Sequence, residues 1–227
     1  ERSITESSLP APFTALHTPY GALNQSGARH RATRISYQPL FQSSALETYL
    51  PVLTKAITQF TDQISRRGHS NIARESKSVC LNLFAELFAG EPLSSEEIDA
   101  YNTYNAALLS LSRRLPAFQR GQAALGFLQQ TMLQRLERFR AGDLPSSCFG
   151  LFSATRDEQD RPWSDERIAT ATVLLIWGAY IEVASLLAST LIQCQHKADV
   201  RDRILQEAAE AGLTDRSTVG TLTQWTL

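Results

Sequence analysis

The sequence has little of what defines several common classes of protein. Its three cysteines, Cys80, Cys148 and Cys194, lie far apart and form no C-x-x-C pair, so the sequence indicates neither a disulfide framework nor a zinc site. Dispersed cysteines are typical of free thiols in a reducing compartment, and we expect a cytoplasmic protein. The 22 basic and 23 acidic side chains give a formal net charge of −1. A general nucleic-acid binder needs excess positive charge, so we expect no nucleic-acid partner.

Several catalytic and targeting signals are also absent from the sequence. It has no glycine-rich phosphate loop, no nucleophile elbow and no H-E-x-x-H motif, which argues against the enzyme classes that depend on them. No basic and then apolar segment of the signal-peptide kind follows Glu1. The chain begins without methionine and ends without a charged tail. We therefore expect it to be part of a longer protein.

Helical periodicity dominates the sequence, and no stretch shows the sustained alternation of a strand. Residues 1–28 are rich in Ser, Pro and Gly and predict a loop-rich lead-in to a single helical domain over 1–227. Capping boxes at Ser44 and Ser94 and an N-cap at Ser164 predict helix starts. The arginines near 135–140 are interpreted as a solvated helix face. The predicted helices span 44–67, 72–88, 95 to about 112, 116–141, 164–196 and 199–211, with stops at Gly68, Gly90, Gly142 and Gly212.

The predicted helix over 164–196 is the most informative element. Residues 173–181 form an uncharged run, apolar on every side of a helix. Such a helix is either buried in a protein core or spans a membrane. Glu182 follows the run directly, and a carboxylate is costly in lipid. We therefore expect one long buried central helix and regard a membrane span as the weaker alternative.

Three motifs in order resemble landmarks of the cytochrome P-450 family. Residues 27–34 read G-A-R-H-R-A-T-R, similar to the G-x-x-H-R-x-x-R helix of that family. Residues 41–51 read F-Q-S-S-A-L-E-T-Y-L-P, similar to its F-x-x-x-x-L-x-x-Y-L-P segment. The long helix then runs into Gln195-His196, similar to the end of the family's central helix. The resemblance covers most of the chain and implies an all-α, cytochrome P-450-like helical domain, incomplete because the C-terminal half of the family is missing.

The resemblance also implies a haem site in a longer parent protein. In the family, a Trp or His and an Arg four residues later bind the two haem propionates, and here these positions are His30 and Arg34. Arginine suits this role because its charge is permanent and its donors form a fork. The family's iron ligand is a C-terminal cysteine. Cys148-Phe149-Gly150 shares only the last letters of that motif and precedes the central helix, so we interpret it as a chance match and expect no metal ligand in this chain.

The central helix departs from the family where oxygen chemistry is expected. Family members carry Ala/Gly-Gly-x-Asp/Glu-Thr there, and an ungapped match from Gln195-His196 aligns Gly178 with the glycine. Trp177 then replaces the small residue, Tyr180 stands at the acid, and Ile181 stands at the threonine. A shift by one residue instead places Ile181 at the acid and Glu182 at the threonine, and neither register restores the pair of an acid and an alcohol. We take Tyr180, Ile181 and Glu182 as the candidate catalytic positions, and Trp177, Gly178, Tyr180 and Ile181 as candidate substrate contacts. Core packing of the two aromatic residues remains an equal alternative.

These observations lead to two hypotheses of different classes. The first is part of a haem-thiolate oxidoreductase that acts on a small hydrophobic substrate such as a terpenoid, retinoid or fatty acid, with an electron-transfer partner. Because Ile181 has no exchangeable proton, the parent enzyme is expected to use peroxide or rearrange an oxidised substrate. The second is a degenerate, haem-free helical module that binds a ligand or partner. In either case we expect this chain alone to be inactive.

Overall fold

The computed structural model describes residues 9–145 and 147–210. This part of the chain is helical, with a single isolated bridge between Arg156 and Pro162 and no strand. The predicted all-α fold is confirmed. The elements are α1 (Ala11–His17), η1 (Ala22–Asn24), α2 (Gly27–Tyr37), η2 (Gln38–Phe41), α3 (Ser43–Arg67), α4 (Ile72–Ala89), α5 (Ser95–Leu108), α6 (Pro116–Ala141), α7 (Cys148–Ala154), α8 (Asp165–His196) and α9 (Ala198–Glu210).

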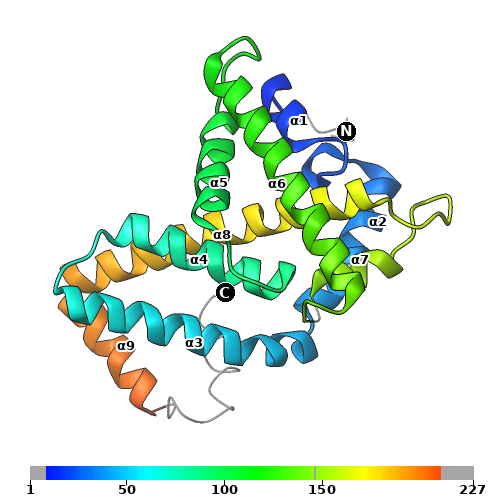
Figure 1. Ribbon diagram of the computed structural model, residues 1–227. Helices are drawn as coiled ribbons and strands as arrows, with labels where there is room; N and C mark the ends of the chain where they lie inside the picture. Colours follow the sequence, from blue (N-terminus) through cyan, green and yellow to red (C-terminus); the bar gives the residue numbers. More distant parts are fainter. Residues whose placement is uncertain (1–8, 146, 211–227) are drawn as a thin grey trace, which may run out of the picture.

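Helix α8 crosses the middle of the molecule (Figure 1), with α4, α6, α7 and α9 packed on it, while α3 packs on α4. Helices α4 and α6 contact α8 directly, and α5 and α6 pair side by side. Residues 167–174 of α8 are buried on every side, although Thr170 and Thr172 are polar, and residues 175–180 alternate between buried and partly buried. Beyond Tyr180 only Ala184 and Ala188 are buried. Within the described residues α8 is also the one helix long and apolar enough to span a membrane, a property that the core helix of a globular protein shares.

Local signals at the helix ends account for most of the helix boundaries. Ser94 and Glu97 form the predicted capping box at the start of α5, and Ser164 caps α8 by accepting a hydrogen bond from the Arg167 amide. Gly68, Gly90 and Gly142 end their helices with left-handed φ angles of 71°, 84° and 85°. This backbone geometry favours glycine because it has no Cβ.

Four local expectations differ from the structure. Ser44 does not cap α3, because the helix already begins at Ser43. Gln42 occupies the N-cap position, and its side chain makes no capping hydrogen bond. The expected 1–28 lead-in contains α1, because Pro12 favours a first helical turn and Leu16 is buried against the core. A short helix, α7, lies between the predicted helices 116–141 and 164–196, where no helix was predicted, because Phe149 and Phe152 are fully buried. These are three of the four differences. The predicted stop Gly212 is not among them, because it lies outside the described residues.

The fourth difference is Arg135, which is buried and not part of a solvated face. Its guanidinium donates to the Glu91 and Pro92 carbonyls at 3.0 and 3.1 Å and to Glu97 Oε2 at 2.9 Å. Glu97 also accepts the Ser94 amide at 2.7 Å. One arginine therefore joins α6 to the capping box of α5, and charge pattern alone does not reveal a partner 38 residues away.

Candidate functional site

A cavity of about 920 Å³ lies between α8 on one side and α1, α2 and η2 on the other. This volume is within the usual range of roughly 300–1,000 Å³ for small-molecule sites. Its walls are mainly apolar, with a few polar groups at the α2 side. The lining residues are His17, Ala22, Leu23, Arg34, Tyr37, Gln38, Phe41, Gln42, Leu174, Leu175, Trp177, Gly178, Ala179, Ile181 and Glu182.

Helical rotation divides α8 into two faces at this point. Leu174, Gly178 and Ile181 recur at three- and four-residue spacing and line the cavity. Ile176 and Tyr180, on roughly the opposite side of the helix, are buried in the core. Since successive residues in a helix differ by about 100° in direction, the candidate positions Tyr180 and Ile181 face different surroundings.

Gly178 leaves open space beside the α8 backbone. A Cβ placed on Gly178 would meet no atom of the described protein within 4 Å. No packing against the described residues therefore demands glycine at this position. The absence of a side chain instead lets a ligand approach the helix backbone closely.

Trp177 forms a fixed wall of the cavity. Its Nε1 donates a hydrogen bond to Asn105 Oδ1 at 3.0 Å, which ties α8 to α5. The Trp177 ring makes edge-to-face contacts with the rings of His17 and Tyr104, at centroid distances of 5.3 and 6.2 Å. Trp177 thus combines both sequence interpretations, since it packs on the core and lines the cavity.

Tyr180 lies in the core and does not line the cavity. It is 0% exposed, and its ring packs edge-on against Tyr101 at a centroid distance of 6.2 Å. Its hydroxyl forms no hydrogen bond with any described residue. Burial raises the pKa of Tyr180 to about 12, so the phenol stays protonated at neutral pH and does not replace a carboxylic acid.

Glu182 is the one ionisable side chain that α8 brings to the described cavity lining. It is exposed at the point where α8 leaves the core. On the opposite wall lies Arg34 of α2, also exposed, and no described carboxylate forms an ion pair with it. The other proposed propionate ligand, His30, lies one turn before Arg34 on α2 and is not among the lining residues.

His17 is a site residue that the sequence analysis missed. It lies at the end of α1, stacks on Phe13 at a centroid distance of 5.2 Å and lines the cavity while being only 4% exposed. Burial lowers its pKa to about 4, so the imidazole is neutral at pH 7. A Cβ on Gly21 would collide with the His17 ring. The helical spacing of Phe13, Leu16 and His17 was the available signal.

No cysteine lines the cavity, although all three lie within the described residues. Burial raises the pKa of Cys80 to about 11 and that of Cys148 to about 12, so both remain thiols at neutral pH. Cys148 lies in α7 against Thr172, with Sγ 3.4 Å from Oγ1. The described residues also contain no cluster of three His, Cys, Asp or Glu side chains that could hold a metal ion.

The order of helices and the cavity beside the central helix define the class of protein. The described chain has the fold of the N-terminal and central portion of a cytochrome P-450, as the sequence motifs predicted. It is similar to cytochrome P-450 120 of Synechocystis (25% identity over 98% of this chain) and to human cytochrome P-450 26B1 (21% identity over 94% of this chain). The chain spans about half the length of these curated relatives, 51% and 44%. No family model matches it.

Solved structures agree with this resemblance. A cyanobacterial CYP120A1 with retinoic acid bound superposes with a TM-score of 0.82 at 26% identity, over 94% of this chain and 50% of that one. CYP152N1 with myristic acid superposes with a TM-score of 0.66 at 18% identity, over 88% of this chain and 48% of that one. The second match supports the fold alone.

Proposed function

We propose that this chain is the propionate-binding and central part of a haem-thiolate oxidoreductase of the cytochrome P-450 kind. The parent protein acts on a small hydrophobic substrate. The observation that carries the proposal is the cavity, in which an apolar helix face with an open glycine lies opposite an arginine without an ion-pair partner among the described residues.

The residues of the cavity fit haem, which combines a flat apolar ring with two carboxylates. Leu174, Gly178 and Ile181 offer the apolar face, and Arg34 offers charge-assisted hydrogen bonds to a propionate. His30 is the second proposed propionate ligand. Bound haem supplies redox chemistry at its iron, and the axial ligand tunes that chemistry. The proposal therefore requires a longer protein that brings a cysteine ligand.

A terpenoid, retinoid or fatty-acid-like substrate suits the rest of the lining. His17 is neutral, Trp177 is fixed, and Leu23 and Phe41 present apolar surface at the rim. One structural neighbour, the cyanobacterial CYP120A1, was solved with retinoic acid, an elongated apolar acid. This neighbour supports the substrate class proposed here.

Proton delivery is the step at which this protein is proposed to differ from ordinary monooxygenases. Ile181 lines the cavity where the family has threonine, and it has no proton to give. Tyr180 is turned into the core, so neither motif position offers a proton to the cavity. Glu182 also lines the cavity, and good coupling of reductant to product in the parent would indicate that protons arrive through its carboxylate instead. We therefore propose that the parent works better with peroxide, which brings its own protons, than with dioxygen and an electron-transfer partner.

A cytoplasmic location is proposed because all three cysteines are free thiols.

The test begins with the intact mass of the parent gene product and its haem content. In that protein Arg34→Ala should reduce haem retention, whereas Arg31→Ala, an exposed arginine of α2 outside the cavity lining, should leave haem retention unchanged. Equal haem retention in both variants contradicts the propionate assignment. A parent that binds no haem would instead support the alternative of a haem-free ligand-binding module.

A further inference from the structure

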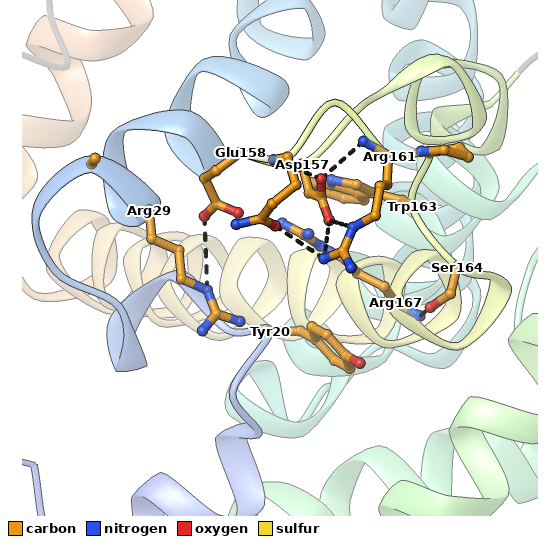
Figure 2. Close-up of a pocket in the computed structure, with 11 residues that line it drawn as sticks. Tyr20, Arg29, Asp157, Glu158, Arg161, Trp163, Ser164 and Arg167 are labelled. Carbon is orange, nitrogen blue, oxygen red and sulfur yellow. Dashed lines mark hydrogen bonds and ion pairs between the residues drawn. The ribbon is translucent and has the colours of Figure 1, made fainter.

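A second cavity, of about 610 Å³, lies between the start of α2, the loop before α8 and the first turn of α8 (Figure 2). Its most unusual lining residue is Arg167, which is only 9% exposed. The guanidinium carbon lies 4.1 Å from the centroid of the Trp163 ring and 5.9 Å from that of Tyr20. Among the described residues no oxygen accepts a hydrogen bond from this guanidinium, and no carboxylate forms an ion pair with it.

The nearby carboxylates do not neutralise Arg167. Asp157 accepts bonds from Arg161 Nε and Nη2 at 3.0 and 2.8 Å, and from the Gln159 and Arg161 amides at 2.9 and 3.0 Å. Its acceptor capacity is therefore used within its own loop (Figure 2). Glu158 makes one long contact, 4.0 Å to Arg29 Nε.

Burial adds to the cost of this arrangement. It lowers the pKa of Arg167, although an arginine stays charged at neutral pH. The first turn of a helix also carries partial positive charge, which disfavours a cation and favours an anion. The guanidinium has no protein acceptor among the described residues, and its nitrogens are not among the fully buried polar atoms, so they face the cavity. A cation held in this way in a cavity wall is available to an anionic ligand.

We propose that this cavity binds a small monoanionic carboxylate with an apolar body, held by Arg167. The cavity contains Arg29, Arg161 and Arg167 against Asp157 and Glu158, so its formal charge matches one negative charge. A phosphate dianion would be repelled by Glu158, the less engaged carboxylate. Tyr20 and Pro162 supply apolar wall for the body of the ligand. The cavity shares no lining residue with the proposed haem site.

Calorimetric titration of the full chain with benzoate at neutral pH, in a buffer free of other carboxylates, tests the proposal. Saturable binding is expected, with inorganic phosphate and neutral benzamide each binding at least about tenfold more weakly. Arg167→Gln should weaken benzoate binding at least about tenfold, since a hydrogen bond to a charged group is lost. Glu158→Gln should strengthen it severalfold by removing a repulsive charge.

Arg120→Gln is the matched control, because Arg120 is exposed on α6 and changes net charge equally. Absence of saturable benzoate binding overturns the proposal, as does equal binding of phosphate or benzamide. Equal affinities of the Arg167→Gln and Arg120→Gln variants overturn it too. Far-UV circular dichroism shows whether Arg167→Gln folds. If it does not, Glu158→Gln decides, and unchanged or weaker benzoate binding by that variant overturns the proposal. These outcomes do not depend on haem, so they are separate from the test of the proposed function.

Discussion

Replacing Tyr180 with phenylalanine is expected to stabilise this fold, although most core substitutions destabilise. The Tyr180 hydroxyl is buried and has no hydrogen-bond partner among the described residues. Taking such a group out of water without a partner costs about 1–3 kcal/mol. Tyr180→Phe removes that penalty and keeps the edge-on contact with Tyr101. After allowance for the small void, the free energy of unfolding should rise by about 1 kcal/mol.

Tyr104 provides the matched comparison for this substitution. It is equally buried, but its hydroxyl donates to the Leu16 carbonyl at 3.3 Å. That carbonyl lies in the last turn of α1, where helix carbonyls lack partners within the helix. Tyr104→Phe should therefore lower the free energy of unfolding by about 1–2 kcal/mol. The same chemical change at two buried tyrosines is expected to have opposite signs.

Urea unfolding followed by far-UV circular dichroism measures both variants. For a domain of this size, about 1 kcal/mol corresponds to a change of roughly 2–4 °C in Tm. A loss of stability in Tyr180→Phe as large as that in Tyr104→Phe would refute the reasoning. It would mean that the Tyr180 hydroxyl is satisfied in solution. A stabilised variant would support the view that this hydroxyl is kept at the expense of stability, as functional groups often are.

Three further predictions concern other parts of the described fold. The pKa of His17 falls from 6.5 to about 4 on folding, so between these values the unfolded chain binds a proton that the folded chain does not. Acidification from about pH 7.5 to about pH 4.5 should therefore lower the free energy of unfolding by about 2–3 kcal/mol. Urea unfolding of wild type and His17→Gln at both pH values checks this, since the variant should lack that component. Arg135→Ala should lower the free energy of unfolding by about 3–5 kcal/mol, because Glu97 would stay buried without its partner. Thermal unfolding measures this loss, and a loss below about 1 kcal/mol would contradict the prediction. This chain reconstituted with haem, reduced and treated with carbon monoxide should give no stoichiometric thiolate-type Soret band, because Cys80 and Cys148 are buried thiols and no cysteine lines the cavity.

Much of the fold could be predicted because its decisive signals are local. The capping box at Ser94, the N-cap at Ser164 and the glycine stops act through backbone groups within a few residues. The long apolar run of α8 likewise fixes a central helix. Helices α1 and α7 could not be predicted in this way, since each has seven residues and depends on burying side chains against distant helices.

The candidate site shows the same division between local and distant information. Trp177, Gly178, Ile181, Glu182 and Arg34 line one cavity, whereas the other two motif positions, His30 and Tyr180, do not. The direction of Tyr180 depends on its packing against Tyr101, which sequence spacing does not encode. His17 reaches the cavity only because α1 folds back over α8 and Gly21 leaves room for its ring.

The uneven burial of α8 has a consequence for how the molecule opens. Between Arg167 and Tyr180 the helix is enclosed by its neighbours, whereas Val183, Leu186 and Ile192 beyond Glu182 are exposed. Backbone amides exchange with deuterium at rates set by the smallest opening that frees them. Amides in the enclosed half should exchange only when the whole domain unfolds, and those after Glu182 through fraying of one end. A single continuous helix would thus contain two cooperative units, with their boundary beside Ile181 and Glu182.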